Sequence, residues 1–537
     1  MVTEISCAQD YPQYRAVGSP FVPLDSWAYP ALEYLAALGY VQTALTGLKP
    51  WTRAECARLT DEAEELLRKA ILGDRPPNEL AAQFHAALTR EFAFELEALG
   101  GGGTRSAHLE SVYARVMSIS GPALTDGFHF GQTIGYDFGR PFRRGTNLLG
   151  GASGRATAGP LAFYLRAEFQ DAPAAPTRSE AELNLIVMRD LVPRHAVRPF
   201  SSINRVVWLD TYASMNFRNL QFSVGKQSLS WGVGEGGSLL LSNNAEPIYM
   251  ARLTRVVPQL SPGFLRRLGP LRWEFFLGRL VGHAFVPRPY IYGQKVSFKP
   301  SPYFEVGYGR STMIGGRGGS PFTTRNFFKS FFGISSGEGR PGNSMNALDV
   351  VARIPLHGNS LLLYAELYQD DEPIYFYRAG RGVLRPGGYI PQLPGLPRLD
   401  FRFEAASSES WSERRHQGNL NYWHLQYRDG YTNRGNLLGN TVGRMGRTLQ
   451  FWTTCRFSPA QSLQFSFKQS RISAAFVPRG GTWYDYSLRH EWRRPSGFYA
   501  RSFLQFERVQ RFPLLFQGHT ANVTASVELG FMPQAKN

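Results

Sequence analysis

The stretch Val523–Phe531, VTASVELGF, alternates between apolar and polar residues at every position. The same two-residue period is present in Leu220–Gly225, Leu463–Lys468 and Tyr484–Trp492. This period is typical of β-strands, whose side chains point to opposite faces in turn. Such segments continue from about His108 to the end of the chain, and no helical pattern between them is regular enough to supply parallel crossovers. We therefore expect an antiparallel sheet.

The connections between these segments alternate in length. Short links are expected at Arg218–Asn219, Lys299–Pro302, His357–Ser360, Ser458–Gln461 and Pro495–Gly497. Long links are expected at Asp171–Ile203, Gly232–Pro247, Arg310–Asn346, Asp370–Arg398 and Asp429–Arg447. Short turns on one rim and long loops on the other are typical of outer-membrane barrels. Two short-side links, near Pro258–Pro270 and Ser407–Leu420, are longer than this rule requires. Residues 104–537 are thus predicted to form a large antiparallel transmembrane β-barrel of about 16–18 strands.

The first hundred residues have a different period. Asp25 and Ser26 can begin a helix that Gly39 ends, and Thr52–Glu55 is a capping box that opens a second helix to about Leu72. A third helix is expected from Pro76-Pro77-Asn78 through Leu99. The glycines at 100–103 follow as a flexible boundary. Residues 1–103 are therefore predicted to be a small α-helical bundle in front of the barrel.

Composition excludes several other classes. Among 537 residues, 14% are aromatic, and no run reaches the roughly 18–20 apolar residues of a spanning helix. The three cysteines form no disulfide framework or metal spacing. Gly232, Gly234 and Gly237 match a dinucleotide motif, but no helix clearly follows to receive a pyrophosphate. We expect no catalytic residues, no metal and no cofactor. No secretory signal is visible in the sequence.

Five motifs, in order along the chain, resemble one known family. They are GKQSLSWGVGEGGSLLLSNNAEP (Gly225–Pro247), GQKVSFKPSPYFEVGYGR (Gly293–Arg310), LLYAELYQDDEP (Leu362–Pro373), LPGLPRLDFRFEA (Leu393–Ala405) and YRDGYTNRGNLLG (Tyr427–Gly439). The chain resembles the Wzi family of capsule-assembly outer-membrane proteins. The resemblance implies a barrel in the bacterial outer membrane with a helical bundle on its periplasmic side. It also implies a lectin-like role in holding capsular polysaccharide or exopolysaccharide at the cell surface.

The charge favours an anionic polymer as the ligand. The formal net charge of +17 creates a positive field, and arginine binds carboxylates and phosphates through two hydrogen bonds at once. We expect arginine on the acidic groups of the polymer and Tyr431 under a sugar face. Single loop residues of these types are more often ordinary turn formers. The candidate residues, all on the expected long loops, are Asn243, Asn244, Arg317, Arg325, Tyr431, Asn433, Arg434 and Asn436.

Two other functions stay open at this point. A pore for anionic solutes is the second candidate, and an outer-membrane hydrolase whose serine and histidine meet only in space is the third. The basic residues could also contact lipopolysaccharide phosphates or pair with acids inside the barrel. They are scattered over strands and loops rather than concentrated in a stripe, so nucleic acid is not an expected partner. We expect a monomer in contact with outer-membrane lipids and lipopolysaccharide.

Overall fold

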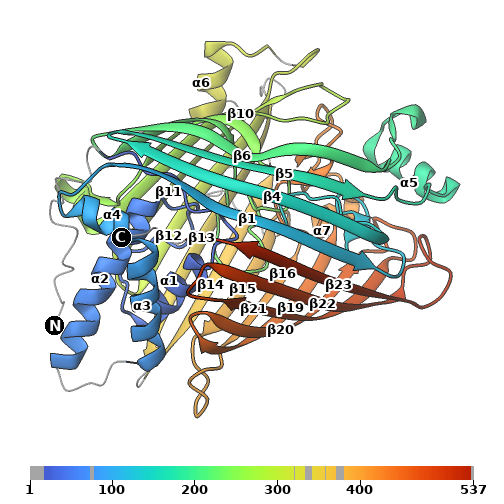
Figure 1. Ribbon diagram of the computed structural model, residues 1–537. Helices are drawn as coiled ribbons and strands as arrows, with labels where there is room; N and C mark the ends of the chain where they lie inside the picture. Colours follow the sequence, from blue (N-terminus) through green and yellow to red (C-terminus); the bar gives the residue numbers. More distant parts are fainter. Residues whose placement is uncertain are drawn as a thin grey trace.

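A computed structural model describes residues 17–72, 78–319, 321–332, 342–356, 359–370 and 380–533. Its main feature is a closed antiparallel barrel (Figure 1). The first strand pairs with the last, in a register from Val112 opposite Phe531 to Ile119 opposite Thr524. The short β9 continues β8 along the same neighbour, β10, so the ring has 18 positions. This confirms the predicted fold class.

The strands and their bounds, in chain order, are β1 (Arg105–Ile119), β4 (Gly145–Ala158), β5 (Leu161–Ala172), β6 (Ile203–Phe217), β7 (Leu220–Gln227), β8 (Ile248–Arg255), β9 (Gln259–Leu260), β10 (Pro270–Arg279), β11 (Tyr290–Ser301), β12 (Phe304–Ile314), β13 (Asn343–Leu356), β14 (Asn359–Asp370), β15 (Val383–Ile390), β16 (Phe401–Ser407), β19 (Gly446–Ser458), β20 (Gln461–Ile472), β21 (Gly481–Arg493), β22 (Phe498–Arg511) and β23 (Thr520–Phe531). Two small hairpins lie between barrel strands: β2 (Thr125–Asp126) with β3 (Gly131–Gln132), and β17 (Thr432–Asn433) with β18 (Asn436–Leu437).

The polarity of the two faces is opposite to that of a soluble protein. On β23 the apolar residues face outward, and Val527 is 49% exposed, whereas Glu528 is 3% exposed. The same holds on β20, where Phe465 is 45% exposed and Ser466 is buried. An apolar outer band around a polar interior is the arrangement that a lipid bilayer requires of a barrel. The alternation in Val523–Phe531 therefore places lipid contacts outside and polar contacts inside.

The two rims differ as predicted. The links at 159–160, 218–219, 302–303, 459–460 and 494–497 lie on one rim, which we call the short-turn rim. Residues 357–358, where another tight link was expected, fall between β13 and β14 but lie outside the described residues. The longer 256–269 link on this rim contains β9 and a 3-10 helix, η3 (Gly263–Leu268). The opposite end is the long-loop rim. It carries α5 (Glu180–Asp190), η2 (Arg194–Ala196), α6 (Thr324–Phe332) and α7 (Trp411–Arg415).

Two strand predictions were wrong, and the two errors cancel in the count. The expected long loop Asp370–Arg398 contains a barrel strand, β15. Its sequence VLRPGGYI lacks alternation, yet Pro386 still takes a place in the ladder opposite Ala365. Conversely, the strand implied between Leu420 and Asp429 does not exist, because residues 408–445 form one excursion from the long-loop rim. Its aromatic side chains, including Tyr422 and Tyr427, are buried inside the barrel against other loops and the strands of the wall.

The expected helices are present with one change. They are α1 (Ala28–Leu38), α2 (Arg53–Leu72), α3 (Glu79–Glu91) and α4 (Ala93–Leu99). Gly39 ends α1 with φ of 88°, and the Thr52 hydroxyl accepts from the Glu55 N–H. The third expected helix is interrupted at Phe92, where Arg53 donates to the carbonyl oxygen of Glu91. Asn78 caps α3, whereas Pro76 and Pro77 lie outside the described residues.

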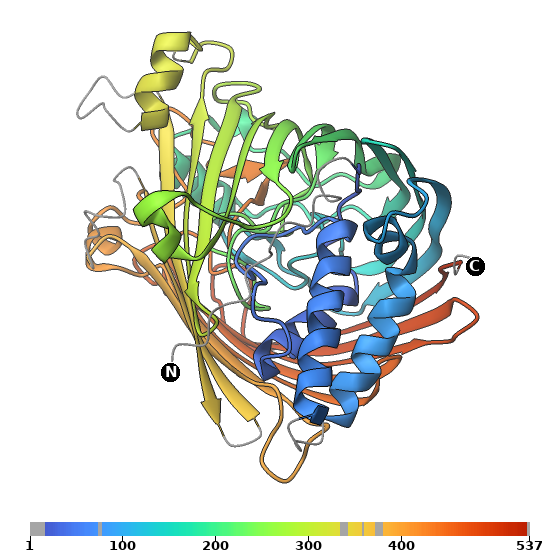
Figure 2. The same cartoon turned by 90° about the vertical axis from the view of Figure 1, so that its left-hand side faces the viewer.

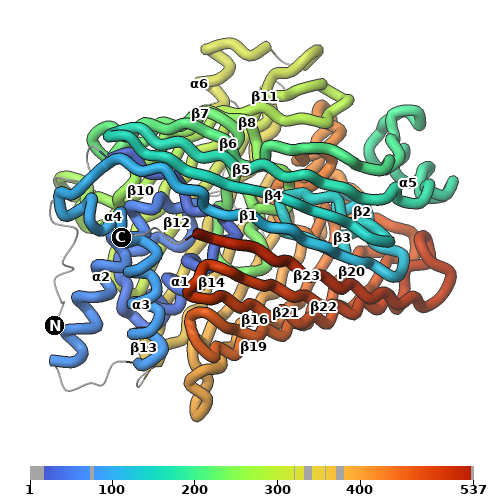
Figure 3. Tube along the Cα trace, viewed as in Figure 1, coloured from blue at the N-terminus to red at the C-terminus, as the bar shows by residue number. Residues whose placement is uncertain are grey.

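These four helices stand across the end of the barrel that carries the short-turn rim (Figure 2). The trace shows β2 and β3 toward the opposite end (Figure 3). In the described part of the chain, no helix has the length and apolar character needed to cross a membrane. The helices form their own core around Leu32, Trp51 and Leu88. They also contact the barrel interior, where the Ser360 hydroxyl on β14 donates to the carbonyl oxygen of Ala37 on α1.

Candidate functional site

The link between β7 and β8, residues 228–247, enters the barrel and reaches the helical end. Ser230 exchanges two backbone hydrogen bonds with Lys49, at 3.0 and 3.1 Å, although Lys49 belongs to the segment between α1 and α2. Trp231 donates its indole N–H to Glu274 on β10 at 2.9 Å. We call residues 228–247 the lumen link. It joins the long-loop rim to the N-terminal helices through the interior.

Glycines allow the lumen link to pass close to the barrel wall. A Cβ atom on Gly232 would lie 1.4 Å from a carboxylate oxygen of Glu366, and the φ of Gly232 is 156°. The backbone N–H groups of Glu235 and Gly236 donate to the Glu404 carboxylate at 2.8 and 3.1 Å. The glycine-rich motif therefore binds wall carboxylates, and no helix follows it in residues 238–247.

Three links from the long-loop rim interlock inside the barrel. Asn243 donates to the carbonyl oxygen of Tyr136 at 2.8 Å, and Asn244 donates to that of Leu437 at 3.1 Å. Asn433 donates to the Glu246 carbonyl oxygen at 2.8 Å. The amides of these three predicted residues therefore hold the loops to one another.

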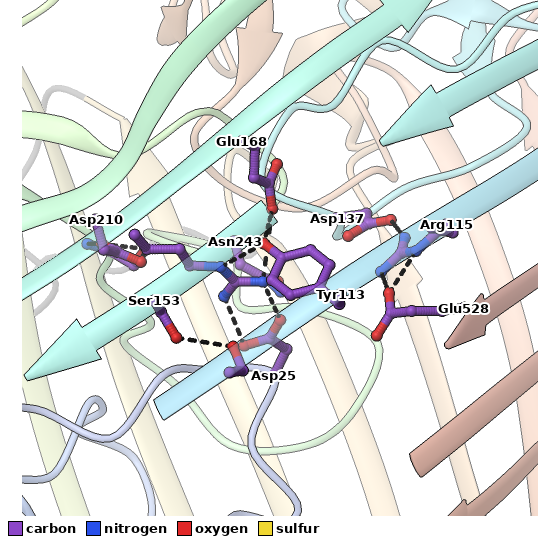
Figure 4. A network of polar contacts seen from close by, with 12 residues as sticks. Asp25, Tyr113, Arg115, Asp137, Ser153, Glu168, Asp210, Asn243 and Glu528 are labelled. Atoms are coloured by element: carbon purple, nitrogen blue, oxygen red, sulfur yellow. Dashed lines mark hydrogen bonds and ion pairs between the residues drawn. The ribbon is translucent and has the colours of Figure 1, made fainter. Parts of the chain in front are cut away.

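A polar network ties the N-terminal segment to these loops through the barrel wall (Figure 4). Arg166 on β5 binds both carboxylate oxygens of Asp25, at 2.9 and 3.0 Å. Burial raises the pKa of Asp25, but Arg166 outweighs burial, so this pKa lies below its ordinary value. Glu168, two residues along β5, pairs with Arg140 in the β1–β4 link, and Arg140 pairs with Asp137. The lumen is thus cross-linked by ion pairs from the helical end toward the long-loop end.

At the long-loop end, one buried carboxylate holds three cations. Lys226 pairs with one oxygen of Glu246. Arg434 lies 3.0 Å from the other oxygen and Arg205 lies 3.4 Å from it. Glu246 is 4% exposed, whereas the Arg434 side chain is 42% exposed. Three cations on one carboxylate leave a local positive excess that faces solvent through Arg434.

Further arginines gather on the short link between β10 and β11, residues 280–289. Arg279 precedes this link and Arg288 lies within it, and both are exposed. The backbone N–H of Arg317 donates to Pro287 at 3.0 Å, and that of Arg434 donates to Val281 at 2.7 Å. Two arginines that are far apart in the sequence are therefore fixed on one ten-residue segment. We call Arg279, Arg288, Arg317 and Arg434 the rim arginines.

The chain is similar to known proteins in sequence and in structure. The sequence model of the capsule assembly protein Wzi family matches residues 114–525.

The chain belongs to the Wzi family of capsule assembly proteins.

It is an outer-membrane barrel, as that family is. A solved structure of Escherichia coli Wzi, described as a carbohydrate-binding β-barrel involved in group 1 capsule assembly, is similar in fold. It shares 16% sequence identity with a TM-score of 0.69, over 96% of this chain and 99% of that one. Acinetobacter baumannii OccAB1 matches at 10% identity with a TM-score of 0.44, over 79% of this chain and 96% of that one. No curated protein matches.

On this Wzi-family barrel, the predicted residues divide into two groups. Arg317, Arg325 and Arg434 are exposed at the long-loop rim. Tyr431 is fully buried and stacks on Tyr422 with ring centroids 6.2 Å apart, so it does not offer a face to a surface sugar. The aromatic residues of this loop belong to a core cluster inside the barrel, because the loop folds inward. Asn436, partly exposed, accepts from Gln132 at 3.4 Å.

Sequence reasoning missed several exposed residues of the same rim. Trp411 on α7 is 66% exposed, and the guanidinium of Arg415 lies 4.9 Å from its ring centroid. Arg279 and Arg288 were also missed, because a ten-residue link gave no pattern of its own. Among the described residues, no cluster of three or more His, Cys, Asp or Glu side chains is suited to hold a metal ion.

Proposed function

We propose that this Wzi-family barrel binds and retains an anionic capsular polysaccharide or exopolysaccharide at its long-loop rim. The observation that carries the proposal is the gathering of the rim arginines around residues 280–289. Among the described residues, Arg279, Arg288 and Arg317 have no carboxylate partner, and Arg434 shares Glu246 with two other cations. Guanidinium groups at a rim are suited to the carboxylates and phosphates of such polymers.

Other features support the same site. Long loops of barrels face the cell exterior, where a capsule lies. Trp411 offers exposed aromatic surface on the same rim, suited to stacking on a sugar ring, in place of the buried Tyr431. The structurally similar Escherichia coli protein is described as carbohydrate-binding, which agrees with this role. The backbone anchors of Arg317 and Arg434 hold these side chains on a supported link, which lowers the entropic cost of binding.

An open pore has less support. The lumen link joins the rim to Lys49, and ion pairs cross the interior from Asp25 to Arg140. A cavity of about 520 Å³ lies beside β19–β23 and is lined by acids and bases together. Planar-bilayer recordings of the full-length protein test this alternative: steady conductance with anion selectivity would place the pore first.

The test of the proposal is sedimentation of purified, detergent-solubilised protein with a uronic-acid polymer. The double variant R317A/R434A is expected to lose roughly tenfold or more in affinity at low salt, because two charge-assisted contacts are removed. Binding by the parent is expected to weaken as salt rises, since exposed charges are screened over about 8–10 Å at physiological salt.

The matched control is R471A/R479A, two exposed arginines of the same rim, one at the end of β20 and one in the β20–β21 link. It preserves the total charge change but leaves the rim arginines in place. A neutral glucan serves as the second polymer. If R317A/R434A binds the acidic polymer as well as the parent does, at both low and high salt, the rim arginines are not the site.

A further inference from the structure

Helix α6 lies outside the ring of strands, against the lipid-facing side of the wall (Figure 2). On β10 and β11, Arg272, Glu274 and Lys295 face the interior, where Glu274 pairs with Arg252 and Lys295 with Asp349. Phe275 and Tyr292 alternate with these residues and therefore face outward. Both are covered by α6, which explains why an outward-facing tyrosine, Tyr292, is fully buried.

The contact between α6 and the wall combines aromatic packing with hydrogen bonds, one of which runs from the Gln294 amide to the carbonyl oxygen of Phe331 at 3.5 Å. The Phe327 ring lies 5.1 Å from Tyr292 and 6.4 Å from Phe275, and Phe331 lies 5.9 Å from Phe275. The Tyr292 hydroxyl donates to Ser330 at 2.8 Å. These contacts hold one side of α6 against the barrel. Another side of the helix does not contact the wall.

The remaining surface of α6 combines aromatic and basic side chains. Phe328 is 50% exposed, and Phe322, just before the helix, is 41% exposed. Arg325 and Lys329 are exposed and lie four residues apart, hence on one side of the helix, turned away from Ser330 and Phe327. Among the described residues, neither cation has a carboxylate partner.

The position of α6 on the barrel indicates which environment this surface contacts. The outward side of β10 and β11 belongs to the band of the barrel that contacts lipid, and α6 packs against this side near the long-loop end of β11. A short helix with phenylalanines on one side and lysine or arginine on the other is the composition of helices that lie in a membrane interface. The short-turn rim repeats this combination in η3, where Phe264 is 83% exposed beside Arg266 and Arg267.

We propose that α6 is a lipid anchor. Its exposed phenylalanines enter the outer leaflet, and Arg325 with Lys329 bind the phosphate of a phosphorylated glycolipid head group. The proposal assigns Arg325 to the lipid rather than to the polysaccharide. It also places the rim arginines, which lie on the neighbouring link, directly above the membrane surface.

Photo-crosslinking in intact cells tests the apolar half of this anchor. A photoreactive phenylalanine analogue replaces Phe328, and in separate strains it replaces Phe506 on the lipid-facing wall, in the half of β22 nearer the long-loop rim, or Trp411 on the loops. The expected result is a lipopolysaccharide adduct at positions 328 and 506. An adduct at 506 without one at 328 would overturn the proposal, because the helix would then lie outside the bilayer.

Native mass spectrometry of the full-length protein with added lipid A tests the basic half. The variant R325A/K329A is expected to retain roughly tenfold less bis-phosphorylated lipid A, because each cation near an anionic surface contributes separately. The control R317A/R434A, which removes two rim arginines instead, is expected to match the parent. Dephosphorylated lipid A shows how much of the retention comes from the acyl chains rather than from the phosphates. Inorganic phosphate shows whether a free anion binds in place of a lipid head group. Equal retention of phosphorylated lipid A by parent and R325A/K329A contradicts the proposal.

Discussion

Single residues in the loops act mainly as ties between segments. His129 illustrates this, since its Nδ1 lies 2.9 Å from Asp126 and its Nε2 lies 2.7 Å from Asp190 on α5. Burial lowers the pKa of His129, but the two carboxylates outweigh burial and raise it from its ordinary value of 6.5 to about 9. The imidazolium is therefore the form that joins the β1–β4 link to α5 at neutral pH.

This tie predicts a pH dependence at the long-loop rim. A raised pKa in the folded state contributes stability that is complete below pH 6.5 and is lost as the pH rises through about 9. The contribution is on the order of 3 kcal/mol at most. Hydrogen exchange of residues 120–144 and 173–202 is expected to accelerate between pH 7 and 10, beyond the intrinsic rate change. In H129Q, exchange should already be fast at pH 7; an unchanged difference between the two pH values in H129Q would disprove the assignment.

How far the site could be predicted from sequence also becomes clear at this scale. The arginines on long loops were found by type and position, and Arg317 and Arg434 are exposed as expected. The roles of Asn243, Asn244 and Asn433 were not visible, because their partners lie on other links more than 100 residues away. Residues that meet only after three loops fold into one lumen leave no local pattern.

At the scale of elements, the two-residue period predicted most strands. It failed where a strand has an unusual composition and therefore no such period. β15 contains Pro386 and two glycines, which are depleted in strands, and its ladder with β14 is nevertheless regular. A barrel supplies hydrogen-bonding neighbours on both sides, so closure overrides weak local preference. The opposite error concerns residues 420–429, where the spacing of the expected links implied a strand. The aromatic residues of this segment instead pack in a core cluster inside the barrel.

The helical elements allow a deletion test. Residues before Gly100 are expected to be dispensable for barrel formation, because strand pairing is complete from β1 to β23 without them. Their loss leaves Arg166, Arg272 and Glu305 without partners from the N-terminal segment, but water in the lumen can solvate these groups. The truncated chain is expected to refold in detergent with a lower melting temperature, measured by circular dichroism. The isolated front piece should be soluble and helical. Failure of the truncated chain to assemble would make the helices part of the barrel's folding core.

At the scale of the whole molecule, the inverted polarity of the two faces determines which substitutions are tolerated. F465R places a charge against lipid in the central part of β20 and is expected to cost about 2–4 kcal/mol, the range for arginine near a bilayer midplane. Q464K places a charge on the other face of the same strand, in the lumen cavity that Gln464 lines. Its effect on stability is expected to be small. Refolding yield, read from the unheated band on a denaturing gel, should fall for F465R alone. Equal yields for the two variants would contradict the assignment of faces.

The seam between β1 and β23 gives the molecule an order in time. β1 obtains its second neighbour only from the final strand, so the ring cannot close until residues through Phe531 have been exported. Throughout that interval the sheet has two open edges, each able to template pairing with another chain. The helices α1–α4 are synthesised first. They can bury their own core while the edges of the sheet are still unpaired. A chain that stops before β23 would keep its edges permanently, and its fate is aggregation or proteolysis rather than a smaller barrel.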